Sequence, residues 1–262
     1  MKVNREIVRL QLAHWCAAPG EGKSYFRPLV CRGDVEQVDI FLVETHPPTP
    51  IPPPVTYAGL DPARARELHE LFLERYPLAD YVGKLTDYAA FTEMCCDVRR
   101  SLGKDLMSPT RQRLEQFIAA NPRADHAVAE VFLNAYPVKD AAALKSEDRR
   151  VVEKGYDLFF ELLHLFRPAW VLLMGKPAFD EGAKYFNARF GVPDFKKRWK
   201  DVEVREPVPV PLATLKLHGV KCHVLGCRSF DKRPVHGLPD SEYSDARFET
   251  FCRSAWQMMS AP

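Results

Sequence analysis

The chain lacks several features that would each indicate a familiar class of protein. None of its 262 residues belong to an apolar run near the ~20 residues that span a bilayer, and the start MKVNREIVRL lacks the apolar core of a secretion signal. We therefore expect a cytoplasmic protein without a membrane partner. The sequence also has no internal repeat and no glycine-rich phosphate loop, which argues against solenoid folds and nucleotide-processing hydrolases.

Cysteine is present, but not in a pattern that indicates a metal site or a disulfide framework. The seven cysteines are odd in number and form no C-x-x-C pair, the spacing of zinc ribbons and many iron–sulfur sites. We expect buried or free thiols, no metal and no cofactor.

The chain also has little excess of one sign of charge over the other. The formal net charge is only +2, and the isoelectric point is about 8.1. Nucleic-acid-binding domains typically have isoelectric points above about 9. The place of the charges along the chain must therefore indicate any partner.

The most informative segment is the apolar run at 38–43, which stops at Glu44-Thr45-His46-Pro47-Pro48. Large β-branched and aromatic residues closed by prolines are typical of a buried parallel strand. Ligands of open α/β sheets collect at the carboxyl ends of such strands. A carboxylate and an imidazole at this strand end are therefore candidates for chemistry.

Further elements follow from apolar patterns and from cap-then-proline signals such as Asp61-Pro62 and Ser108-Pro109. The segment 191–211 is expected to be an irregular excursion or an edge hairpin. We predict strands at 129–133, 169–174 and 221–225, and helices at about 62–76, 79–102, 109–121, 146–166, 177–190 and 241–259.

This order predicts an α/β fold: a single domain over 1–262, with a central four-stranded, mostly parallel sheet flanked by helices on both faces. Three strand ends, at 44–48, 134–138 and 226–229, would then converge on one edge of the sheet.

Four strings in this order resemble motifs of the uracil-DNA glycosylase superfamily. They are VDIFLVETHPP at 38–48, VFLNAYPV at 131–138, RPAWVLLMGKPAF at 167–179 and KCHVLGCRS at 221–229. The resemblance covers most of the chain and implies a uracil-DNA glycosylase-like fold, with DNA, single- or double-stranded, as the partner of a monomer.

The chain departs from the family pattern at the reactive positions. Glu44 stands where the family has glycine, and His46 where it has aspartate, asparagine or alanine. The catalytic histidine position of the last motif falls near Gly226, followed by Cys227 and Arg228. The chain also lacks the cysteines of the iron–sulfur branch.

Glu44 and His46 are the candidate catalytic residues. Cleavage of an N-glycosidic bond builds positive charge on the sugar and negative charge on the departing base. Either side chain could orient water at the sugar, and a protonated His46 could instead stabilise the leaving base. The alternatives are a loop hydrogen bond for Glu44 and a solvated position for His46.

Asn134 is the candidate for base recognition, because its amide offers a donor and an acceptor side by side, as the edge of a flipped pyrimidine requires. The alternative is an asparagine that caps a turn. Tyr136 and Tyr57 are possible stacking platforms or ordinary packing residues.

Basic residues in two segments could contact DNA phosphates. Lys197 and Arg198 lie in the densest basic run, 196–200. The loop after the last predicted strand is where the family carries the wedge that probes a duplex. There Arg228, Ser229, Lys232 and Arg233 are candidate DNA contacts, and Phe230 or Leu238 could fill the space of a flipped base.

Two hypotheses remain open. One is a monofunctional DNA glycosylase that removes uracil or a modified cytosine, such as glucosylated hydroxymethylcytosine, in repair or phage defence. Because none of the predicted strand ends carries a lysine, the sequence argues against a lyase step through a Schiff base. The other is a glycosylase-like DNA-binding module without catalysis.

Overall fold

The centre of the molecule is one sheet of six strands in the order β1-β3-β2-β4-β6-β5. The computed structural model describes residues 3–17, 25–47, 61–103, 105–122, 127–138, 141–204, 207–230 and 245–260. The strands are β1 (Leu29–Arg32), β2 (Val38–Glu44), β3 (Ala127–Phe132), β4 (Trp170–Met174), β5 (Val210–Leu217) and β6 (Val220–Cys227).

The four inner strands, β3, β2, β4 and β6, are parallel, and they are the four strands that the sequence predicts. Glu44 at the end of β2 is level with Phe132 of β3. Leu173 of β4 is level with both Val43 and Gly226. The carboxyl ends of these strands therefore lie along one edge of the sheet.

The expectation of a four-stranded, mostly parallel sheet is wrong in strand number, because an antiparallel strand closes each side. β1 pairs with β3, and β5 pairs with β6. β1 has only four residues, and Pro211 lies at a register shift in β5, so neither strand shows a long regular pattern in sequence. Proline is tolerated on an edge strand, where its missing N–H interrupts no inner ladder.

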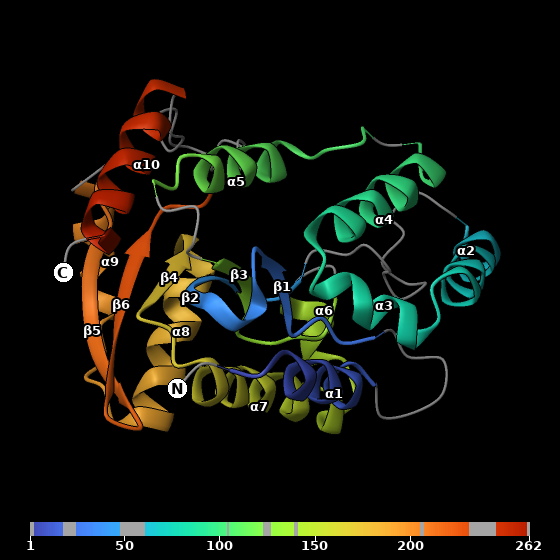
Figure 1. The fold of residues 1–262 in the computed structure, drawn as a ribbon, viewed down its shortest axis with the longest axis horizontal. Coiled ribbons are helices and arrows are strands. Elements are labelled where there is room, and N and C mark those ends of the chain that lie inside the picture. Colours follow the sequence, from blue (N-terminus) through green and yellow to red (C-terminus); the bar gives the residue numbers. More distant parts are fainter. Residues whose placement is uncertain are drawn as a thin grey trace.

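Helices cover both faces of the sheet (Figure 1). No described helix is long and apolar enough to cross a membrane. The α-helices are α1 (Arg5–Cys16), α2 (Pro62–Arg75), α3 (Leu78–Leu85), α4 (Tyr88–Ser101), α5 (Pro109–Ala119), α6 (Ala141–Lys145), α7 (Arg149–Phe166), α8 (Gly175–Phe190), α9 (Trp199–Val204) and α10 (Asp245–Ser260), with short 3-10 turns η1 (Val35–Gln37) and η3 (Lys196–Arg198).

The predicted helix starts are confirmed where a capping side chain precedes proline. Asp61 accepts hydrogen bonds from the amides at the start of α2, and Ser108 accepts one from Arg111 N at the start of α5. These bonds satisfy amides that have no partner within the helix.

Other predicted helix boundaries are corrected by local caps. The helix expected at 79–102 is two helices, because Asp87 caps α4 by accepting from Ala90 N. The helix expected from 146 begins at 149, capped by Asp148, and α6 precedes it. The segment 191–211 holds η3, α9 and the first residues of β5 in place of a hairpin.

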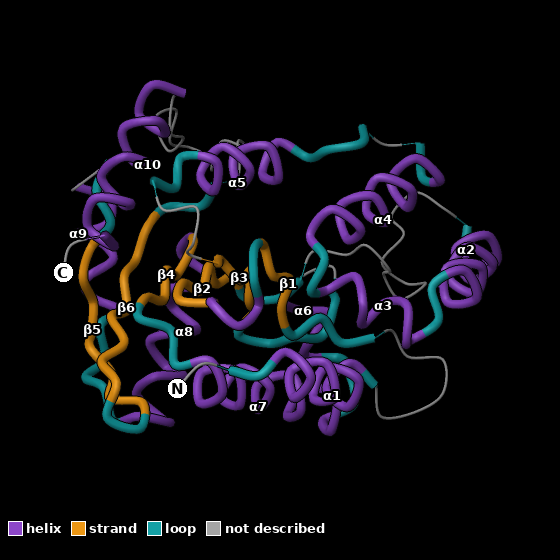
Figure 2. The backbone as a smooth tube through the Cα atoms, in the orientation of Figure 1, coloured by secondary structure: helices purple, strands orange, loops and turns teal. Residues whose placement is uncertain are grey.

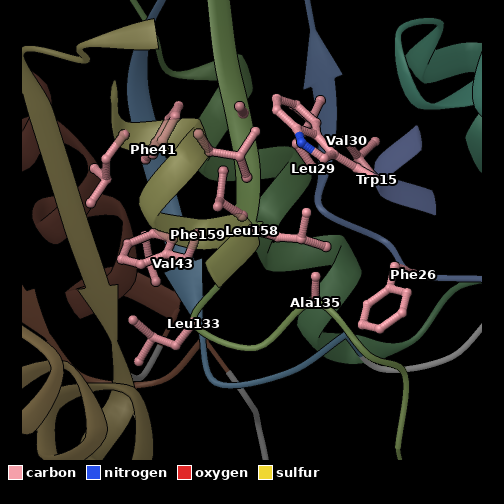
Figure 3. Close-up of a cluster of buried hydrophobic side chains, with 14 of the residues drawn as sticks. Trp15, Phe26, Leu29, Val30, Phe41, Val43, Leu133, Ala135, Leu158 and Phe159 are labelled. Carbon is pink, nitrogen blue, oxygen red and sulfur yellow. The ribbon is translucent and has the colours of Figure 1, made fainter. Parts of the chain in front are cut away.

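Alternate side chains of the inner strands pack into two separate apolar cores on opposite faces of the sheet. Phe41 and Val43 of β2 belong to the larger core, which they form with α1, α7 and α8, whereas Ile40 and Leu42 point to the smaller core under α5 and α10. Figure 2 shows the sheet between these helices, and Figure 3 shows part of the larger core around Phe159. Burial on both faces holds the strand ends in place and explains why these strands read as apolar runs.

Candidate functional site

A cavity of about 370 Å³ lies at the edge where the parallel strands end. Glu44 and Thr45 from the end of β2, and Met174 from the end of β4, line it. The other lining residues come from the start of α8, the segment after β6, α4, the α4–α5 connection, the start of α5 and the segment before β1: Gly175, Pro177, Ala178, Ser229, Phe91, Thr92, Cys95, Cys96, Arg99, Leu106, Met107, Ser108, Thr110, Arg111 and Arg27.

The pairing of β2 with β3 fixes the position of Glu44. Its carbonyl oxygen accepts a hydrogen bond from Leu133 N at 2.9 Å, and its half-buried side chain lines the cavity. Thr45 O accepts in turn from Asn134 N at 2.9 Å. Pairing with β3 and the segment that follows it therefore holds Glu44 beside the cavity at the carboxyl edge of the sheet.

His46 lies two residues further along and is half-buried. Its Nδ1 is 3.3 Å from Thr45 Oγ1. It is not among the described residues that line the cavity, so the two catalytic candidates occupy different environments.

Asn134 is 1% exposed, and contacts within the fold occupy both ends of its side-chain amide. Nδ2 donates to Val152 O at 3.0 Å, and Oδ1 accepts from Tyr136 N at 3.0 Å. The amide therefore ties the turn after β3 to the start of α7 and does not line the cavity. This is the turn-capping role that the sequence left open as the alternative.

Two of the proposed stacking and wedge residues, Tyr136 and Phe230, lie in the cores. Tyr136 is fully buried, with its ring centroid 5.2 Å from that of Phe26. Phe230 is 1% exposed and packs on Phe117 and Phe248, so the expectation that it probes a duplex is corrected. Phe230 is buried because the apolar faces of α5 and α10 pack against it. The other candidates of these two kinds, Tyr57 and Leu238, lie outside the described residues.

The basic candidates that the structure describes come from η3 and from the segment that follows β6. Arg228 is half-buried and donates to Glu203 O at 3.1 Å, and its neighbour Ser229 is exposed at the cavity. Lys197 is exposed, whereas Arg198 donates to Asp201 at 3.3 Å and does not line the cavity. The remaining candidates, Lys232 and Arg233, lie outside the described residues.

Arg27 is the cavity residue that the sequence did not reveal. It is 2% exposed, and its guanidinium carbon lies 4.7 Å from the ring centroid of Phe132 and 5.4 Å from that of Phe91. Burial lowers the pKa of Arg27. The available signal was a single arginine within the apolar run from Tyr25 to Val30.

A second arginine of the cavity is neutralised by a neighbour. Arg111 of α5 donates two parallel hydrogen bonds to the carboxylate of Glu130 on β3. Burial alone would lower the pKa of Arg111, but the charge and hydrogen bonds of Glu130 outweigh it, so the pKa is raised well above its usual value. This ion pair joins α5 to the sheet beside the cavity.

Comparison with known proteins gives no family for the chain. Neither the models of protein families nor the curated protein sequences contain a match. Within the described ranges, no group of three or more histidine, cysteine, aspartate or glutamate side chains could hold a metal ion.

The chemical capacity of the cavity follows from its lining. It brings together one carboxylate from Glu44, the hydroxyls of Thr45, Thr92 and Ser108, and the positive charge of Arg27. A carboxylate can orient water or stabilise a cation, and a buried guanidinium can stabilise an anion. Cleavage of a bond between a developing cation and a leaving anion requires both groups.

Proposed function

We propose that the protein is a DNA glycosylase that hydrolyses the N-glycosidic bond of a flipped pyrimidine base, uracil or a modified cytosine. The observation that supports this most is the carboxylate of Glu44, which enters a cavity at the carboxyl edge of the parallel strands. The ordered motif resemblance of these same strand ends supports it independently.

In this proposal Glu44 acts at the sugar. The bond between C1′ and the base nitrogen breaks with its electron pair going to the base, while the carboxylate stabilises the positive charge that develops on the sugar. A water oriented by the carboxylate adds its oxygen to C1′, and its proton passes through Glu44 to solvent or to the released base. The products are an abasic site and a free base.

The cavity size is compatible with a base that carries a substituent. Sites for small molecules occupy about 300–1,000 Å³, and this cavity has a volume of about 370 Å³. Because the Asn134 amide is engaged within the fold, base recognition falls to the groups that line the cavity. We therefore place modified cytosine beside uracil as a substrate.

The same proposal includes DNA as the partner, action as a monomer and a cytoplasmic location. Ser229 lies at the cavity, next to Arg228, so a strand whose base has entered would pass these residues. Phosphate contacts from this side would hold the strand while the base is unstacked.

Excision assays test this proposal directly. DNA that contains uracil and DNA that contains glucosylated hydroxymethylcytosine are each incubated with purified protein, and abasic sites are revealed by alkaline cleavage. We expect cleavage of at least one substrate and a loss of about 100-fold or more in Glu44→Gln, as is usual for a group that acts in proton transfer. Glu153→Gln, an exposed glutamate on α7, is the matched control.

His46→Gln in the same assay separates the two catalytic candidates. A small effect is expected, since His46 does not line the cavity. If neither DNA yields alkali-labile sites with the wild-type protein, the glycosylase proposal fails.

One observation favours the non-catalytic alternative. The last strand carries Gly226 near the position where the family has its catalytic histidine, and both Gly226 and the following Cys227 are buried. A DNA-binding module would retain DNA in a mobility-shift assay, with equal affinity in the wild type and Glu44→Gln, and would produce no abasic site.

A further inference from the structure

The guanidinium of Arg27 is a buried cation, and part of its hydrogen-bonding capacity is unused among the described residues. Its Nε and Nη2 atoms are inaccessible to solvent and have no hydrogen-bond partner among the described residues. The rings of Phe91 and Phe132 flank the group, and the residue lines the cavity. Contact with two aromatic rings helps to hold the guanidinium in place.

Among the described residues, the neighbours of Arg27 supply no negative charge that it does not share with another cation. Burial raises the pKa of Tyr81 and raises that of Cys95 to about 11, so both remain neutral at physiological pH. Glu130 is close enough to act on Arg27 through its charge, but its carboxylate holds Arg111 in a two-bonded pair. A buried charge without a partner is unfavourable, and an anionic ligand would remove that penalty.

Two further features of the cavity favour an anion. Thr92 Oγ1 is a second buried polar atom that has no hydrogen-bond partner within the described ranges. The first turn of the 16-residue helix α8 also lines the cavity, and no side chain caps its amides. The amino end of a helix carries partial positive charge.

The burial of Arg27 limits which anion can reach it. With 2% of the residue exposed, the phosphodiester backbone of a polymer has little access to its guanidinium, and a ligand must approach it from the cavity that Arg27 lines. A planar ligand edge with two adjacent electronegative atoms matches the fork of a guanidinium.

We propose that Arg27 recognises negative charge on the base that occupies the cavity. That charge belongs either to the ionised ring edge of the departing base or to a carboxylate substituent of a modified base. This inference rests on the proposed function, and it assigns Arg27 the stabilisation of the leaving base, while Glu44 acts at the sugar.

Ligand binding tests this assignment without any excision step. Calorimetric titration uses three free probes: uracil, its carboxylate derivative orotate, and inorganic phosphate. Orotate is expected to bind the wild type about ten- to a hundredfold more tightly than uracil at neutral pH, the range that hydrogen bonds to a charged group provide. Uracil should bind more tightly as the pH rises and its ring ionises.

Three variants make the test specific. Arg27→Met should abolish both effects, and Arg27→Lys should retain part of them because it keeps the charge but loses the fork. Arg99→Met removes an equal charge from a half-buried residue of the same cavity and should retain most of the preference for orotate. Arg27→Met should fold at least as stably as the wild type, because the substitution removes an unpaired buried charge.

The proposal would be overturned if Arg27→Met bound orotate as tightly as the wild type does and also bound ionised uracil as tightly. Binding of phosphate alone, lost in Arg27→Met, would overturn it too and would identify a phosphate site. If Arg27-dependent binding occurs but no DNA is cut, the glycosylase function fails while the anion site stands. If Arg27→Met excises the base at the wild-type rate, the glycosylase function stands and the role of Arg27 in stabilising the leaving base fails.

Discussion

Gly155 of α7 lies so close to Asn134 that a Cβ at position 155 would fall 2.0 Å from Asn134 Oδ1. Asn134 uses that oxygen to accept from Tyr136 N and uses its Nδ2 to donate to Val152 O. The glycine therefore creates the space in which the amide joins the end of β3 to the helix. The strand end and α7 are connected through this side chain and through the backbone hydrogen bond from Ala135 N to Gly155 O at 3.2 Å.

Substitution Gly155→Ala should destabilise the fold by about 2–4 kcal/mol, because the methyl group displaces the amide and two buried hydrogen bonds are lost. Urea unfolding gives the free energy. Gly83→Ala is the matched control: it lies in α3 where a Cβ would meet open space, and it should stabilise by about 0.5–1 kcal/mol. Equal stability of Gly155→Ala and the wild type would contradict this account of Asn134.

The Arg111–Glu130 pair should be a large contributor to stability when it is broken on one side. Arg111→Met leaves the 5%-exposed Glu130 without its partner and should cost about 3–5 kcal/mol. Arg149→Met breaks an exposed pair with Glu153 and should change stability by less than about 1 kcal/mol. Thermal and urea unfolding compare the two, and similar losses in both variants would refute the distinction.

Acidification should weaken the contact between α7 and the β5–β6 turn. His164 Nδ1 lies 2.9 Å from His218 Nε2, and burial, then the charges of His218 and Arg167, lower the pKa of His164. The unfolded chain binds a proton near pH 6.5 and the folded chain only at lower pH, so this contribution to stability is present above about pH 6.5 and declines below it.

Histidine titration by NMR checks this prediction. His218→Asn should raise the pKa of His164, since asparagine removes the neighbouring charge and tolerates the left-handed backbone at φ 48°. An unchanged His164 titration in this variant would show that the pair is not coupled.

Alkaline conditions should destabilise the protein through its buried thiols. Burial raises the pKa of Cys31 and Cys222 to about 12 and that of Cys95 to about 11, from an ordinary 9.0. Unfolded thiols lose protons from about pH 9, whereas the folded ones retain them, so stability is full below pH 9 and falls as pH rises toward 11–12.

Urea unfolding between pH 8 and pH 10.5 should show this loss, and Cys31→Ala should reduce its pH dependence. At pH 8 these thiols should also react with iodoacetamide much more slowly in the folded protein than in urea. Equal rates in the two states would mean that the thiols are not protected by burial.

The sequence predicts the inner part of the fold because that part is specified locally. The strands predicted at 38–43 and 169–174 contain unbroken apolar runs, at 40–43 and 169–174, which are typical of a strand buried on both faces. Asp61 and Ser108 mark helix starts because their side chains bond to amides two or three residues away. Such interactions are visible in a short stretch of sequence.

The outer strands depend on partners that are distant in sequence. β1 is stabilised by pairing with residues about a hundred positions later, and β5 bends at Pro211. The residues of the candidate site likewise divide into those that could be predicted from the local sequence and those that could not. Glu44 was predictable as a strand end, whereas Arg27 reaches the cavity only because the unpredicted β1 runs antiparallel to its neighbour.

That direction of β1 has a consequence for how the molecule assembles. The cavity draws Arg27 from before the first strand and Ser229 from after the last, so its walls come from segments separated by most of the chain. Contacts of such long sequence separation form late and slowly. A nascent chain that has not yet emerged through β6 therefore has the isolated parts of a site but no closed cavity, and any activity must appear only after Ser229 has been synthesised.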